Sequence, residues 1–188
     1  NALLLAVFLI FLIIVAQFNK LTAPLIIMTA VLFSTIGVFL GLVIFNMEFI
    51  IIMTMIGIIS LAGIVVNNAI VLLDFVELEK KRKREQTGTE LTLPEVVTAI
   101  TQAGKTRLRP VLLTAITTVL GLIPLAVGIN IDFIKFFSVY DPDYYVGGDS
   151  VAFWAPLSWT IIFGLTFATF LTLVVVPVMY LLTEKRMF

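Results

Sequence analysis

Five long stretches of this sequence contain no charged residue, and they restrict its fold more than any other feature. A transmembrane α-helix needs about 20 apolar residues to cross roughly 30 Å of hydrocarbon. Each stretch is near or above this length. Backbone N–H and C=O groups must be paired inside a membrane, so we predict a membrane-spanning helix in each stretch. The stretches are Asn1–Asn19, Leu21–Met47, Phe49–Leu73, Pro110–Ile131 and Ser150–Thr183.

These stretches predict an all-α fold, a polytopic membrane helix bundle formed by one domain over residues 1–188. The predicted spans cover about 2–18, 23–45, 50–76, 107–128 and 156–182. A cytoplasmic connection over 77–106 holds one further short helix, and a periplasmic loop covers 129–155. Since the sequence begins at Asn1 without an initiator Met or a basic leader, we expect it to be part of a longer protein.

The composition supports a membrane protein and argues against an enzyme. Hydrophobic residues make up 61% of the chain and charged residues 13%, whereas ordinary globular domains carry about 25% charged residues. Cysteine and histidine are absent. Their absence removes disulfides, cysteine nucleophiles, Cys/His zinc sites and the Ser-His-Asp triad. We therefore expect no enzymatic activity, no metal site and no bound cofactor.

The basic residues predict the orientation of the bundle. With five spans, eleven of the twelve Lys and Arg residues fall on the side of the 77–106 connection, and only Lys135 falls on the other. Cytoplasmic loops of membrane proteins carry an excess of Lys and Arg. We therefore predict that the N-terminus lies outside and the C-terminus lies in the cytoplasm.

A short amphipathic helix is predicted inside the 77–106 connection. Thr92 and Glu95 have the spacing of a capping box, which marks a helix start. Gly104 is placed to end the helix. Its predicted apolar face would lie on the inner membrane surface. The residues of that face are Leu93, Val96, Val97 and Ile100.

Polar and small residues form a stripe on the third predicted span. Ser60, Gly63, Asn67 and Asp74 recur at a spacing that places them on one helical face, and Asn68 points about 100° away from Asn67. Stripes of this kind turn toward protein instead of lipid. We expect this face to meet another helix.

The fourth predicted span carries a matching stripe of Arg107, Thr114, Thr118 and Gly121. The third and fourth spans run antiparallel, and both Asn67 and Thr114 lie about 12 Å from the inner ends of their spans. A contact between them is therefore possible. The two stripes could also serve only to hold helices together, at about 0.6 kcal/mol per polar contact.

Glycines on four spans are predicted to mark close helix packing. Gly37 and Gly41 form a GxxxG pattern on the second span, and Gly164 opens a small-residue series on the fifth. Gly63 and Gly121 lie on the two polar stripes.

Two segments resemble a known family. Gly63–Phe75, which reads GIVVNNAIVLLDF, resembles the tenth transmembrane helix of resistance–nodulation–division efflux permeases. Arg107–Thr114, which reads RLRPVLLT and continues to Leu125, resembles the start of their eleventh helix. The resemblance covers essentially the whole chain.

This resemblance implies that the chain is helices eight to twelve of a twelve-helix permease in the bacterial inner membrane. Such permeases are homotrimers that exchange protons for exported compounds, including drugs, with the proton gradient as energy source. The implied partners are the rest of the same permease, a periplasmic adaptor, an outer-membrane channel and the lipid bilayer. No nucleic-acid partner is implied.

The resemblance also assigns roles to individual residues. The relay threonine is Thr114 and the relay arginine is Arg107, while Asn67, Asn68 and Thr118 support the relay. The family carries a lysine at the position of Asn67, and an amide cannot take up or release a proton near neutral pH. Charge compensation is therefore expected to differ here. Two alternatives stay open: a protein-export accessory subunit of the same superfamily, and a structural membrane bundle without transport.

Overall fold

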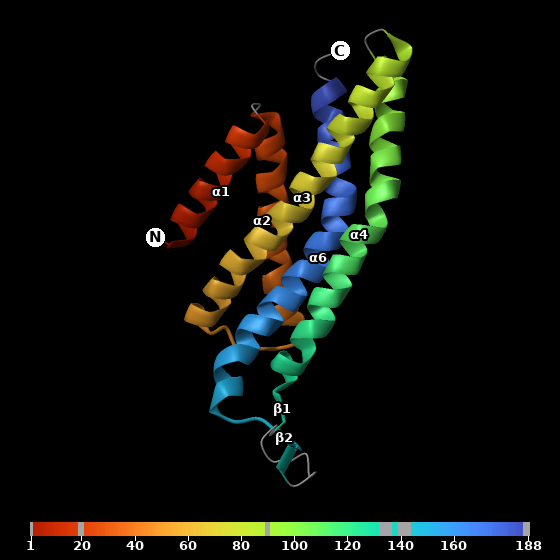
Figure 1. Ribbon diagram of the computed structural model, residues 1–188. Coiled ribbons are helices and arrows are strands. Elements are labelled where there is room, and N and C mark those ends of the chain that lie inside the picture. The colour runs from red at the N-terminus through yellow and green to blue at the C-terminus, as the bar shows by residue number, and fades with distance from the viewer. Residues whose placement is uncertain (1, 19–20, 89–90, 132–136, 139–143, 186–188) are drawn as a thin grey trace.

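The computed structural model describes residues 2–18, 21–88, 91–131, 137–138 and 144–185. It confirms the all-α helix bundle (Figure 1). The long apolar stretches form its helices, because helices pair all of their backbone groups internally. The five helices are α1 (Ala2–Phe18), α2 (Thr22–Ile44), α3 (Ile51–Thr87), α4 (Leu93–Val127) and α6 (Asp149–Lys185).

Four of these helices, α2, α3, α4 and α6, are long and apolar enough to cross a membrane. Helix α1 has 17 residues, which is the lower end of the range for a transmembrane helix. Its crossing of the membrane stays a prediction. Helix α6 packs against α2, α3 and α4, so the core forms around it.

Glycines allow α2 and α6 to cross at close range. A Cβ atom at Gly37 would meet Phe167 Cβ at 2.5 Å, and a Cβ atom at Gly41 would overlap the side chain of Phe163. A Cβ atom at Gly164 of α6 would overlap Leu61 of α3 in the same way. Backbones can approach this closely only where the side chain is a hydrogen atom.

We expect Gly41→Leu to destabilise the 188-residue chain by about 1–3 kcal/mol, because the new side chain would force α2 away from α6. The indole of Trp159 stacks on the ring of Phe163, at 5.3 Å between centroids, and therefore reports on this contact. Unfolding in a denaturing-detergent titration, followed by tryptophan fluorescence, measures the change. Gly121→Leu is the matched control, since a Cβ atom at Gly121 has no neighbour within 4 Å. Equal stability of the two variants would contradict this account.

The connection between α3 and α4 differs from its predicted form. The predicted capping box is present, because the backbone N–H and the hydroxyl of Thr92 both donate to Glu95 Oε2 at 2.7 Å. These two hydrogen bonds lower the pKa of Glu95 below its ordinary value. The helix does not end at Gly104, however. It continues as α4 through Pro110, and this boundary was predicted wrongly because an interior glycine costs only about 1 kcal/mol.

Part of the predicted apolar face of this segment is covered by protein, whereas Val97 is exposed. Its position on the inner membrane surface stays a prediction. Val96 and Ile100 are buried in the bundle core, which includes Leu73 and Val76 of α3. Lys83 of α3 donates to the Glu95 carbonyl at 3.4 Å. The inner ends of α3 and α4 therefore form a helical hairpin that extends beyond the predicted spans (Figure 1).

At the end of the bundle where α4 finishes and α6 begins, strands β1 (Ile129–Ile131) and β2 (Tyr144–Val146) pair antiparallel, with Ile129 opposite Val146. Gly128 ends α4 in the left-handed region, at φ 79°. The indole N–H of Trp159 on α6 donates to the Ala126 carbonyl at 3.0 Å. This carbonyl belongs to the last turn of α4, where helical partners run out. Residues 132–136 and 139–143 of the predicted periplasmic loop lie outside the described residues.

Helix α6 begins at Asp149, seven residues before the predicted start near Pro156. In the structure Pro156 lies inside α6. A proline there removes one backbone hydrogen bond, and the helix continues around it.

Candidate functional site

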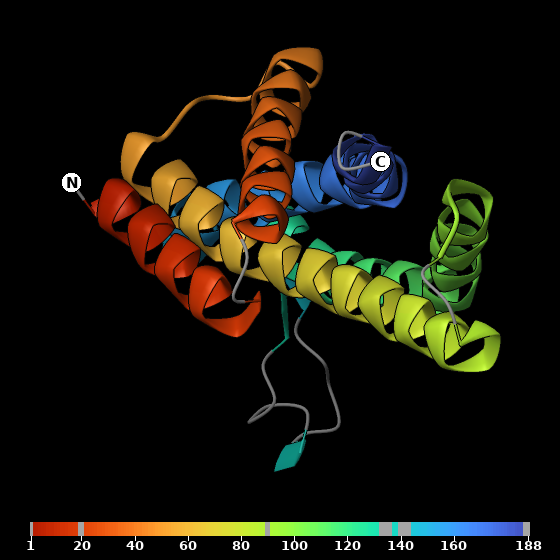
Figure 2. The ribbon, with the colours of Figure 1, turned by 90° about the horizontal axis from the view of Figure 1, so that it is seen from above.

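The polar stripe of α3 lies on the open side of the helix. Ser60, Gly63, Asn67 and Asp74 are all exposed, so the predicted meeting of this face with another helix is not made within the described part of the chain. Asn68 points inward and is 8% exposed. Helix α3 runs obliquely across the bundle between α1 and α4 (Figure 2). Ser60, Gly63, Asn67 and Asp74 of α3, with Thr114, Thr117 and Gly121 of α4, are called the polar face below.

The α4 part of the polar face is open too. Thr114, Thr117 and Gly121 are exposed, and Thr118 is half-buried. The hydroxyls of Thr114 and Thr118 each donate at 2.8 Å to the carbonyl four residues earlier. Each hydroxyl oxygen can still accept a further hydrogen bond. The polar face therefore presents hydrogen-bond acceptors to the segment that covers it.

Arg107 fixes the register between the two helices. Its guanidinium carbon lies 4.5 Å from the centre of the Phe75 ring. Seven residues along each antiparallel helix lead to Asn68 on α3 and Thr114 on α4, about 10.5 Å from that contact. The two residues therefore lie at a similar depth. Arg107 Nε is buried and has no hydrogen-bond partner among the described residues.

The relay roles stay predictions at this point. Asn67 and Thr114 share no hydrogen bond within the described part of the chain, where the Thr114 hydroxyl is bonded to Pro110. A Cβ atom at Gly63 or Gly121 would meet no atom within 4 Å. Close helix packing at Gly63 and Gly121 therefore stays a prediction, and its partner would be a segment outside this chain.

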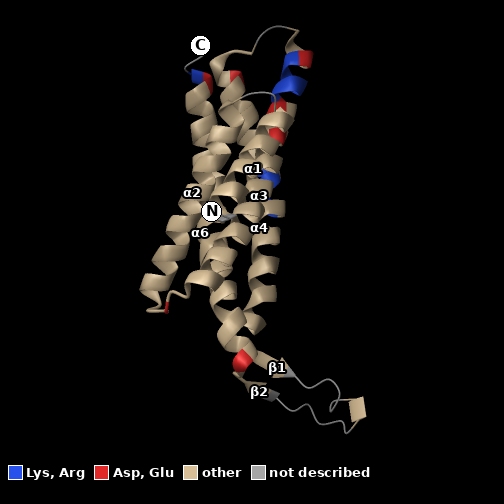
Figure 3. Ribbon diagram, turned by 90° about the vertical axis from the view of Figure 1, so that its left-hand side faces the viewer, with Lys and Arg blue, Asp and Glu red and all other residues tan. Residues whose placement is uncertain are grey.

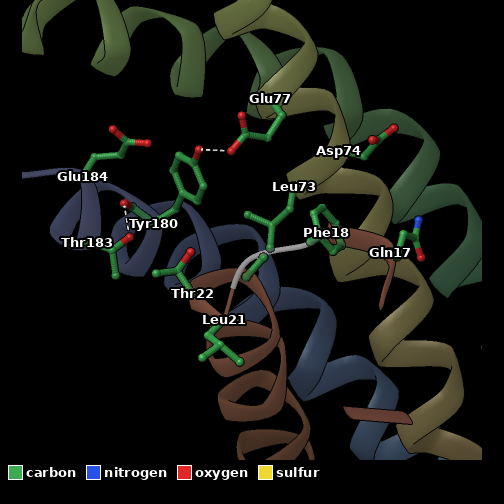
Figure 4. A pocket seen from close by; sticks show the side chains of 11 residues that line it. Gln17, Phe18, Leu21, Thr22, Leu73, Asp74, Glu77, Tyr180, Thr183 and Glu184 are labelled. Carbon is green, nitrogen blue, oxygen red and sulfur yellow. Dashed lines mark hydrogen bonds between the residues drawn. The ribbon is translucent and has the colours of Figure 1, made fainter. Parts of the chain in front are cut away.

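A second polar cluster, which sequence reasoning missed, joins α3 to α6 at the inner end. The Tyr180 hydroxyl donates to Glu77 Oε1 at 2.6 Å, and the Lys80 ammonium donates to the Tyr180 hydroxyl at 3.1 Å. Lys80 also forms an ion pair with Glu184. A sequence signal does exist: polar residues three or four apart at the inner ends of two spans share a face. Glu77, Tyr180 and Glu184 of this cluster line the pocket in Figure 4.

The family model described as the AcrB/AcrD/AcrF family matches residues 2–131. The chain belongs to this family. Its resemblance to resistance–nodulation–division efflux permeases is thereby confirmed.

Relatives of this AcrB/AcrD/AcrF family chain include the swarming motility protein SwrC of Bacillus subtilis (strain 168), which is 37% identical over 98% of the chain. The multidrug resistance protein MdtC of Erwinia tasmaniensis is 35% identical over 86% of it. A crystal structure of a heavy metal efflux pump matches with a TM-score of 0.69 and 30% identity over 95% of the chain. The chain spans 15%, 13% and 14% of the lengths of these three proteins, respectively.

Proposed function

We propose that this chain is the C-terminal transmembrane half, helices eight to twelve, of a proton-driven permease that exports small molecules. The polar face carries this proposal. Asn67 and Thr114 are exposed in the middle of helices that are apolar enough to span a membrane. Polar groups facing hydrocarbon are unfavourable, so such residues face protein or a water-filled cavity. The proposed cover is the other transmembrane half of the same permease.

In this proposal Thr114 and Arg107 belong to the proton relay, and Asn67, Asn68 and Thr118 support it. The carboxylates that take up protons at mid-membrane depth lie in the other half, as the family resemblance implies. The same resemblance supports a homotrimer, a periplasmic adaptor and an outer-membrane channel as assembly partners. The names of the relatives, which include multidrug resistance and heavy metal efflux, support export as the activity.

Export by the full-length permease is expected to stop when the proton gradient is collapsed. The measurement is dye export from proteoliposomes with an imposed pH gradient, with and without a protonophore. Empty liposomes under the same gradient are the control. Export that continues at the same rate without a gradient would contradict the proposed function.

The proposed orientation places the α3–α4 hairpin and the end of α6 in the cytoplasm. Every Lys and Arg that the structure describes lies in the half of the bundle away from the β1–β2 hairpin (Figure 3). This charge bias is the signature of a cytoplasmic side. Lys20, Lys135 and Arg186 are outside the described residues.

Single cysteines test this orientation. We expect a cysteine in place of Gly88 to react with a membrane-impermeant reagent only from the cytoplasm, and one in place of Gly147 only from outside. These glycines lie at opposite ends of the bundle, after α3 and before α6. Intact cells and inverted vesicles give the two arms. Labelling of both positions from one side would refute the topology.

A further inference from the structure

A pocket of about 580 Å³ opens at the inner end of the bundle (Figure 4). The end of α1 and the start of α2 form one wall, and turns of α3 and α6 form the others. Apolar side chains, including Leu73, form one part of the lining, and carboxylates form another. Its carboxylates come from two helices and are Asp74, Glu77 and Glu184.

Glu77 is held at this pocket by the cluster between α3 and α6. Tyr180 donates to Glu77, Lys80 donates to Tyr180, and Lys80 pairs with Glu184. Tyr180 is 6% exposed, and the side chains of Lys80 and Glu184 are each 12% exposed. A buried polar network with its hydrogen bonds made is rigid, because breaking any member leaves others unpaired. The Glu77 carboxylate therefore has a fixed position beside the opening.

Asp74 connects this pocket to the polar face. It lines the pocket, and it lies seven residues after Asn67 on the same exposed side of α3. Seven helical residues correspond to about 10.5 Å along the axis, toward the inner end. A proton leaving the depth of Asn67 thus reaches Asp74 first and Glu77 one turn later.

The other groups around Asp74 and Glu77 can be named helix by helix. From α4, Arg107 lies over the ring of Phe75. From α6 come Tyr180 and Glu184, whereas α1 and α2 contribute Gln17 and Thr22, which do not titrate. Lys20, between α1 and α2, lies outside the described residues. On α3 itself, Lys80, Lys81 and Arg84 border an adjacent cavity that Asp74 and Glu77 also line.

We infer that this pocket is the inner proton-exchange mouth of the permease, where Asp74 and Glu77 pass protons between the relay and the cytoplasm. The inference rests on the proposed proton-driven function. An arriving proton binds a carboxylate oxygen of Asp74 and is then transferred through water to Glu77. Glu77 releases it to cytoplasmic water, and both groups return to the carboxylate form. Lys80, Tyr180 and Glu184 position Glu77 and undergo no net change.

The test uses the full-length permease in proteoliposomes whose lumen faces the cytoplasmic side of the protein. A pH dye in the lumen reports proton entry during export of a fluorescent dye that the wild type transports. We expect Asp74→Asn and Glu77→Gln each to slow proton entry by about tenfold or more, because an amide cannot carry a proton. The rate should also change its dependence on lumenal pH, while its dependence on external pH stays that of the wild type.

Two further variants separate this role from a structural one. Glu79→Gln is the matched control, since Glu79 lies on α3, pairs with Arg82 and does not line the pocket. It should transport like the wild type. Asp74→Glu restores a carboxylate and should restore proton entry, which excludes misfolding as the cause of the loss. Wild-type proton entry and unchanged lumenal pH dependence in both Asp74→Asn and Glu77→Gln would overturn the inference. A wild type that ignores the gradient would instead overturn the proposed function.

Discussion

Proteoliposomes that contain only residues 1–188 are expected to show no export driven by a proton gradient. Coupling requires a group that changes charge inside the membrane. At mid-membrane depth the described helices offer Asn67, Asn68 and Thr114, none of which titrates near neutral pH. Glu48 lies between α2 and α3, and Asp74 lies near the end of the predicted span 50–76. Export should therefore fall to the rate of empty liposomes.

The full-length permease, reconstituted and measured in parallel, is the control for this experiment. Correct folding of the 188-residue chain is checked by its helical circular dichroism and by the fluorescence of Trp159 against Phe163. Gradient-driven export by the short chain alone would show that the polar face carries complete coupling. The assignment of Asn67 and Thr114 as supporting residues would then be wrong.

Asn67→Leu in the full-length permease is expected to reduce export by about 5- to 100-fold at equal expression. The amide is exposed on the polar face, so its partners are expected in the covering half. Replacing it by leucine would leave those partners unpaired at low dielectric, at about 1–3 kcal/mol for each group. Dye efflux from cells that express equal amounts of each variant measures the effect.

Ile70→Ala is the comparison for Asn67→Leu. Ile70 lies one turn further along α3 and is half-buried against the core, so its truncation tests general packing of the same helix. It should lower export less than Asn67→Leu does. Equal export by the two variants would mean that Asn67 holds helices together and has no further role.

The sequence predicted the helices but not all of their ends. Absence of charge locates a span because the membrane excludes charge, yet a helix is free to continue beyond the membrane. Helix α3 continues to Thr87 through the basic residues after Val76, since Lys and Arg favour helices and Arg82 pairs with Glu79. Hydropathy therefore predicts which residues lie in the bilayer, whereas backbone hydrogen bonding determines where the helix ends.

The candidate site also has one part that the sequence predicts and one part that it does not. Helical periodicity alone predicts that Ser60, Asn67 and Asp74 share one side of α3, and the structure adds that this side is exposed. The cluster at the inner end required knowledge that α3 packs against α6, because Glu77 and Tyr180 are 103 positions apart. Periodicity gives the face of one helix but does not say which helix covers it.

The unbroken course of α4 also has a mechanical consequence. From Leu93 to Val127 it has 35 residues, or about 52 Å of helix, and β1 begins two residues later at Ile129. A helix of this length transmits a tilt around one of its residues to both of its ends. A tilt of about 5° around Thr114 would move the Val127 end by roughly 2 Å and the Leu93 end by roughly 3 Å, in opposite directions. Small rearrangements at the polar face would thus become larger displacements at the two ends of α4, and Pro110 and Pro124 inside the helix are the points where it could bend.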